Sequence, residues 1–136
     1  MGVEFYGEAS SPKAIVIRAI VKIEGIKFFS PPDYSQQIGL MTRPAGYSVP
    51  AHIHNSIERV ITSTQEVLIL RKGECVITLM DRAGNSQNKI NLTSGDVILL
   101  AHGAHKVDML TECEILEIKQ GPYAGEFDKT FIKANP

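Results

Sequence analysis

The chain is poor in cysteine and carries little net charge. Its two cysteines, Cys75 and Cys113, lie among strand-like apolar residues and form no CxxC pair, so we expect buried thiols rather than a disulfide or a thiolate metal site. The net charge is -1 at pH 7, and lysine and arginine are scattered along the sequence. Because no basic stretch is concentrated in one place, nucleic acid is not an expected partner.

Long apolar runs are also missing. None approaches the length of roughly 20 residues that spans a bilayer, and the N-terminal stretch MGVEFYGEASSPK has no apolar signal-peptide core. We therefore expect no membrane partner and a cytoplasmic location. With 136 residues, the chain is long enough for one hydrophobic core and one site, so a single domain over 1–136 is predicted.

A helical pattern is the third absence, since no 3.6-residue apolar period persists for three turns, and no repeat is present. Strand-length runs rich in β-branched residues occur instead, separated by turns rich in Gly, Pro, Asn and Asp. These runs are 14–23, 27–30, 37–41, 66–70, 75–81, 89–92, 96–100, 105–110 and 114–119. The pattern predicts an all-β sandwich or barrel of antiparallel strands, with an irregular tail at 120–136 that wraps the body.

The four histidines occur in two pairs, His52 with His54 and His102 with His105. On an extended strand alternate residues share a face, so His52 and His54 project to one side about 6.5–7 Å apart along the chain. Both imidazoles then reach one ion. The other interpretation is that these are ordinary satisfied or surface histidines, but their distribution favours a metal site.

Glu66 is the candidate carboxylate for such a site. It opens the strand 66–70 and shares a face with Leu68 and Leu70, which are apolar. An unpaired carboxylate on a buried face costs several kcal/mol, so Glu66 needs a partner. A metal ion is one possible partner.

These residues resemble the first cupin motif, G-x5-H-x-H-x3-4-E-x6-G. Gly46 precedes His52 and His54 by the spacing of the motif, and Glu66 precedes Gly73 by the spacing at its other end. Eleven residues replace the usual three or four between His54 and the glutamate, and we expect this insertion to form a loop at the mouth of a barrel. Glu58 satisfies the short spacing but lacks the following glycine, so Glu66 is preferred.

A second cupin motif, G-x5-P-x-G-x2-H-x3-N, is similar to the region that starts at Gly95. Gly103 matches, His105 comes one residue early, and Lys106 holds the strict histidine position, with His102 as the alternative ligand. The resemblance covers about 37–120 and implies a cupin-type double-stranded β-helix, or jelly-roll, barrel. The chain also looks like small bacterial cupins that accompany sugar and surface-polysaccharide biosynthesis.

The resemblance implies a divalent transition ion, with Fe, Mn, Zn, Ni and Cu all compatible with imidazole and carboxylate ligands. The implied ligands are His52, His54, Glu66 and His105. Without His105, the remaining two histidines and one carboxylate resemble the facial triad of non-haem iron enzymes.

The resulting hypothesis is a metal-dependent isomerase, epimerase or oxygenase acting on a small polar molecule such as a sugar or nucleotide sugar. His102, Lys119 and Tyr123 are the candidates for catalytic proton transfer. One alternative is a non-catalytic cupin that binds a small ligand. Another is a metal-free sugar ketoisomerase-like cupin that uses a histidine with Tyr47 or Tyr123. A homodimer is expected, because the apolar run 14–23 has the length and β-propensity to extend a neighbour's sheet.

Overall fold

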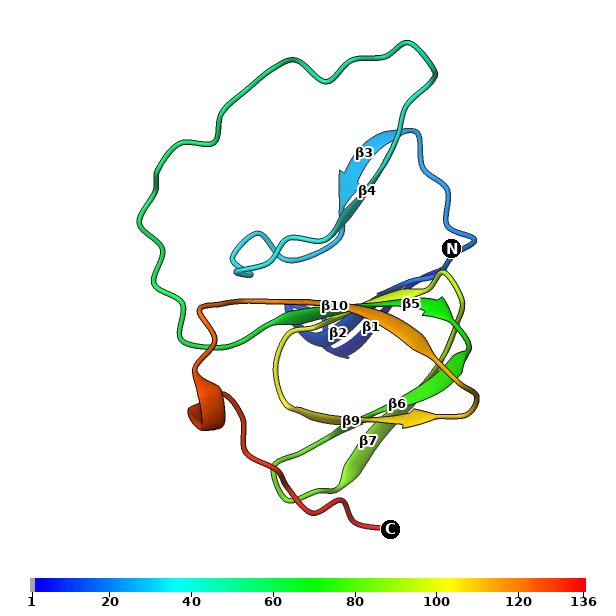
Figure 1. Ribbon diagram of the computed structural model, residues 1–136, viewed down its shortest axis with the longest axis vertical. Helices are drawn as coiled ribbons and strands as arrows, with labels where there is room; N and C mark the ends of the chain where they lie inside the picture. The colour runs from blue at the N-terminus through cyan, green and yellow to red at the C-terminus, as the bar shows by residue number, and fades with distance from the viewer. Residues whose placement is uncertain (1) are drawn as a thin grey trace.

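The computed structural model describes residues 2–136, which form three antiparallel sheets (Figure 1). The large sheet has the order β1 (Val3–Glu8), β2 (Ser11–Ile17), β8 (Val97–Leu100), β5 (Glu66–Lys72), β10 (Glu114–Lys119). The small sheet has the order β7 (Ser86–Thr93), β6 (Glu74–Met80), β9 (Ala104–Met109). β3 (Gly25–Phe28) and β4 (Gly39–Thr42) pair as a separate hairpin.

The expected all-β class is confirmed. Among residues 2–136 there is no α-helix, and the only helical turn is a 3-10 turn, η1, at Gly125–Phe127. The sheets stay separate in this part of the chain, and none closes into a barrel. The coarse class follows from local sequence, whereas barrel closure depends on which strand edges meet.

Most of the expected strands from residue 66 onward are present within a few residues of the predicted bounds. The run 14–23 differs, because its strand ends at Ile17. β2 also lies between β1 and β8 inside the large sheet, so this run has no free edge to offer a second molecule. β1 was not expected, and it pairs with β2 through register contacts such as Phe5 with Ile15.

The core has two layers, one on each face of the large sheet. Between the large and small sheets lie Ala14, Val16, Leu68, Leu70, Cys75, Ile77, Leu79, Ile90, Leu92, Ile98 and Leu100. On the opposite face Ile15, Ile17 and Leu99 pack against Ile38 from the connection that precedes β4. The central strands of the large sheet are therefore buried on both faces, as their continuous apolar runs require. This rigid sheet carries one wall of the site described below.

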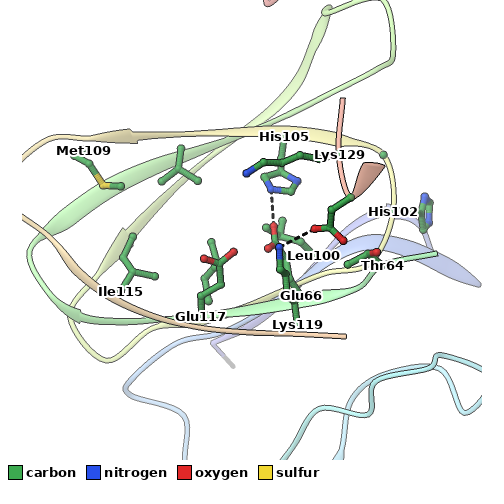
Figure 2. Close-up of a pocket in the computed structure, with 14 residues that line it drawn as sticks. Thr64, Glu66, Leu100, His102, His105, Met109, Ile115, Glu117, Lys119 and Lys129 are labelled. Carbon is green, nitrogen blue, oxygen red and sulfur yellow. Dashed lines mark hydrogen bonds and ion pairs between the residues drawn. The ribbon is translucent and has the colours of Figure 1, made fainter. Parts of the chain in front are cut away.

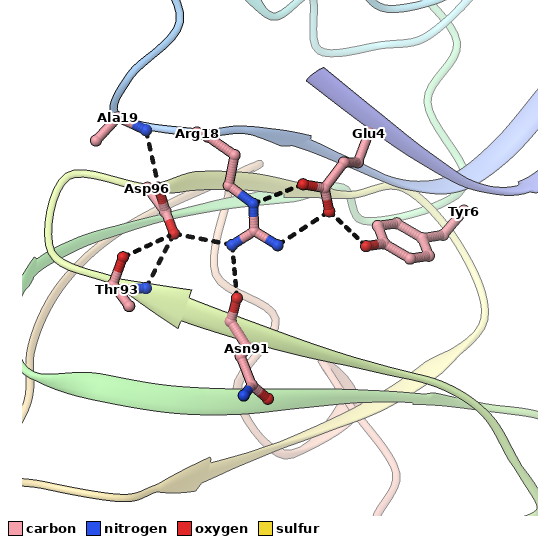
Figure 3. Close-up of polar contacts among 7 residues, drawn as sticks. All are labelled: Glu4, Tyr6, Arg18, Ala19, Asn91, Thr93 and Asp96. Atoms are coloured by element: carbon pink, nitrogen blue, oxygen red, sulfur yellow. Dashed lines mark hydrogen bonds and ion pairs between the residues drawn. The ribbon is translucent and has the colours of Figure 1, made fainter. Parts of the chain in front are cut away.

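An ionic network joins the two sheets at one end of the sandwich (Figure 3). Arg18 donates from Nε and Nη2 to the two carboxylate oxygens of Glu4, at 2.7 and 2.9 Å. Its Nη1 donates to Asp96 Oδ2 at 2.9 Å and to the Asn91 carbonyl at 2.6 Å. Because Glu4 is on β1 and Asn91 on β7, one guanidinium connects the large sheet to the small one.

Thr78 on β6 is a buried residue whose side-chain hydroxyl lacks a hydrogen-bond partner in the described residues. Within the described residues its Oγ1 is a buried side-chain atom that has no hydrogen-bond partner, and the residue is only 1% exposed. An unsatisfied buried hydroxyl costs free energy, and valine keeps the shape without the polar atom.

We therefore expect Thr78→Val to raise the free energy of unfolding by about 1 kcal/mol. Urea unfolding followed by circular dichroism measures this change. Thr78→Ala is the control, because it removes the same hydroxyl but leaves a cavity, and it is expected to be less stable than the valine variant. A valine variant that is less stable than wild type would show that the hydroxyl is satisfied.

Two segments lie outside the sheets. Residues 43–63, here called the arc, follow β4, contain no strand and bulge away from the body (Figure 1). The tail runs back along the small sheet, where the Asn135 amide bonds to the Gly84 carbonyl at 2.9 Å. Nowhere in residues 2–136 is there a helix with the length and apolarity to cross a membrane.

Candidate functional site

A cavity of about 440 Å³ lies between β9 and β10, the outer strands of the two sheets. Its apolar half consists of Leu68, Leu100, Val107, Met109 and Ile115. Its polar half consists of Thr64, Glu66, His102, His105, Glu117, Lys119, Asp128 and Lys129. The size and mixed lining suit a small molecule that has both polar groups and an apolar face.

Glu66 and His105 form the central contact of this cavity (Figure 2). His105 Nε2 lies 2.7 Å from Glu66 Oε1, and their side chains are 31% and 15% exposed. Glu66 is the first residue of β5 and His105 the second of β9, so the contact joins the large sheet to the small sheet. Two residues chosen from separate sequence motifs thus meet at one wall.

The His105 hydrogen bond holds the pKa of the Glu66 carboxyl below its ordinary value, although burial opposes this shift. The nearby Glu117 carboxyl shows the opposite behaviour, since hydrogen bonding to Glu66 raises its pKa, with burial acting in the same direction. Two neighbouring carboxyls whose pKa values are pushed apart are a common property of sites that handle protons or cations.

Glu117 was not predicted as a site residue from the sequence. The alternation of β10 places Ile115, Glu117 and Lys119 on the face that lines the cavity. The signal available in the sequence was that Glu117 alternates with Ile115 and Lys119 on one face of the expected strand 114–119. Lys119, expected as a catalytic residue, lines the cavity and donates to Asp128 Oδ2 at 2.9 Å.

His105 and its neighbour Lys106 lie on opposite faces of β9, because side chains alternate along a strand. His105, Val107 and Met109 share the face toward the cavity, whereas Lys106 bonds to Asp108 at 3.1 Å on the other face. The shortened second motif therefore delivers His105, and not the residue at the strict position, into the site.

His102 also lines the cavity but stands apart from the central pair in Figure 2. Its Nε2 lies 3.0 Å from the Ser11 carbonyl oxygen and 3.2 Å from Ser11 Oγ. Through this contact His102 holds the loop after β8 against β2.

The two other predicted ligands, His52 and His54, are in the arc. Both are exposed, and their ring centroids lie 5.2 Å apart. Neither lines the cavity. Glu58 is likewise exposed in the arc, whereas Glu66 is in the cavity wall. The structure thus brings Glu66 and His105 together and leaves the HxH pair elsewhere in the same chain.

The candidate tyrosines also lie outside the cavity lining. Tyr123 is 77% exposed, with the Lys119 ammonium 5.8 Å from its ring centroid. Tyr47 is in the arc beneath the Arg43 guanidinium, at 4.6 Å. In this conformation neither phenol is beside the Glu66–His105 pair.

The fit to a divalent ion is therefore partial. Glu66 and His105 present one carboxylate and one imidazole, which are ligands that transition ions accept. In the part of the chain that the structure describes, however, no three His, Cys, Asp or Glu side chains gather as a metal-binding group. A single chain in this conformation does not assemble the four-ligand set.

Comparison with protein-family models, with curated proteins and with solved structures returns no match for this chain. The cupin resemblance accordingly rests on the motif residues themselves.

Proposed function

We propose that this chain is a cupin-type enzyme that acts on a small polar molecule, such as a sugar or nucleotide sugar, by isomerisation or epimerisation. The observation that carries the proposal is the 2.7 Å contact between Glu66 and His105 at the wall of the 440 Å³ cavity. In the proposal the two sheets belong to a jelly-roll barrel whose open side is the cavity mouth.

The chemistry follows from the residues in the wall. Glu66, held ionised by its neighbour, fixes the orientation of His105 through Nε2. The other ring nitrogen, Nδ1, is then the one that exchanges a proton with a bound molecule, as an oriented histidine does in general acid–base catalysis. Glu117 and Lys119 offer an acceptor and a donor for hydroxyl groups.

A divalent transition ion remains part of the proposal, with Glu66 and His105 as two of its ligands. The competing version is a metal-free enzyme in which the same pair acts alone. The two versions differ in what a chelator does.

We expect the purified protein to take up about one divalent transition ion per chain and to lose turnover when the ion is removed. Dialysis against Fe(II), Mn, Zn, Ni and Cu, followed by elemental analysis, measures uptake. Turnover is followed by NMR on a panel of sugars and nucleotide sugars, with and without chelator.

Turnover that is unchanged by complete removal of metal would establish the metal-free version. Absence of both uptake and turnover across the panel would contradict an enzymatic role, and a ligand that still bound would point to the non-catalytic alternative.

A further inference from the structure

The arc is anchored at both ends but not between them. It follows β4 directly, and just beyond its other end Gln65 is held by Gln36 and Gln120 through hydrogen bonds of 2.8 to 3.2 Å. The large apolar side chains of the arc are all exposed, and Ile53 and Val60 reach 88% and 85%. They are Tyr47, Val49, Ile53, Ile57, Val60 and Ile61. Such a set needs a surface to cover it.

The solvent-accessible surface of the whole chain also indicates that a covering partner is missing. The chain exposes 9707 Å², whereas a compact monomer of its mass exposes roughly 7,000 Å². The excess of about 2,700 Å² lies at the upper end of what permanent homodimers bury, roughly 1,000 to more than 2,500 Å² per copy. The hairpin contributes to the excess through Ile26, Phe28 and Met41, each about half exposed.

A free sheet edge, to which the arc can add as a strand, lies beside the cavity. Within the described residues β9 pairs only with β6, so its other edge presents unpaired backbone groups. Free edges of this kind accept an added strand. Because His105 projects from β9 into the cavity, a strand added there runs directly beside it.

The arc has the alternation of such a strand. Tyr47, Val49 and Ile53 share one face, and His52 and His54 share the other with Pro50. Proline is tolerated in an added strand, which becomes the new edge, when its nitrogen faces outward. With the histidine face toward the cavity, the two imidazoles lie beside Glu66, which lines it.

The occupant of the β9 edge is a second copy. The hairpin and the arc lie on the side of the large sheet opposite the small sheet that contains β9 (Figure 1). If the arc folded back onto its own β9, the hairpin's apolar side chains would stay in water. A second copy covers both, and an isologous exchange satisfies both arcs at once.

We propose that two copies of this chain exchange their arcs, so that His52 and His54 of one copy complete the site of Glu66 and His105 of the other. The inference rests on the proposed function for the metal role of these residues. It explains why one chain holds only half of the predicted ligand set.

The first experiment is complementation with Mn and Zn as probes. A chain with His52→Ala and His54→Ala is coexpressed with a differently tagged chain that has Glu66→Gln and His105→Ala, and the mixed dimer is isolated. We expect about one ion per mixed dimer, against about two for wild type and close to none for either variant alone. A mixed dimer without ion, beside a wild type that binds, would overturn the exchange.

The second experiment does not depend on metal. Ile53→Cys in one tagged chain and Asp108→Cys on β9 of the other, both with Cys113→Ser, are treated with a short bismaleimide. We expect a covalent dimer on a denaturing gel, and much less when Ile20→Cys, an exposed position outside the arc, replaces Ile53→Cys.

A chain with both cysteines that cross-links only at monomer mass would overturn the exchange. Cross-linked dimers from a protein that binds no ion would support the exchange and contradict the metal role. The two failures are therefore distinguishable.

Discussion

Replacing Asp96 with asparagine is expected to lower the free energy of unfolding by about 3 kcal/mol. The Asp96 side chain is only 4% exposed and receives the Arg18 guanidinium at 2.9 Å. It also accepts from the backbone amides of Thr93 and Ala19, each at 2.9 Å (Figure 3). The amide side chain removes the charge that faces Arg18 and replaces an acceptor with a donor.

The pH dependence of this loss follows from the carboxyl's pKa. Burial acts to raise the pKa of Asp96, but the bonds from Thr93, Ala19 and Arg18 outweigh it, and the pKa is lowered. A carboxylate with a lowered folded pKa stabilises the protein fully above its unfolded pKa, about 4, and less as pH falls through the folded pKa. The difference between wild type and Asp96→Asn should therefore be largest near pH 7 and shrink below pH 4.

Urea unfolding at several pH values measures both effects. Asp108→Asn is the matched control, because Asp108 pairs with Lys106 at the surface and both side chains are about half exposed. Its change is expected to stay within about 0.5 kcal/mol. Equal losses in the two variants would show that the Arg18 network adds nothing beyond a surface ion pair.

Strand positions were predictable where the cause of the strand is local. β5 to β10 are β-branched runs that end at turns such as Gly73, whose φ of +95° suits only glycine. The end of β2 was not predictable, because the chain turns where Arg18 and Ala19 bind Asp96, a residue about 78 positions away. β1 was missed for a different reason, because it pairs with the adjacent β2 but its sequence VEFYGE contains only one β-branched residue.

The candidate site residues also fall into two groups, those whose position follows from the sequence and those whose position does not. Motif spacing and strand alternation suffice to select Glu66 and His105, because each lies on a strand whose faces are fixed by the core. They do not place His52 and His54. Their segment has the alternation of a strand but no neighbour of its own, and spacing within one chain contains no information on which edge the segment joins.

Glu66→Gln is expected to lower the affinity for the ion by at least about tenfold and turnover by about a hundredfold. Glutamine keeps the size of the side chain but removes the anionic oxygen that accepts from His105 at 2.7 Å. It also removes the charge that orients the imidazole, so the loss should appear in turnover even if the proposed activity is metal-free.

Glu58→Gln is the matched control, with the same chemical change at the glutamate that satisfies the shorter motif spacing. Glu58 is exposed in the arc, away from the cavity lining, so its replacement should leave affinity within about threefold and turnover unchanged. Competition titration with a chromophoric chelator measures affinity, and circular dichroism verifies that each variant is folded. An equal or greater loss in Glu58→Gln would mean that the carboxylate ligand comes from the arc together with the two histidines, and that Glu66 only positions His105.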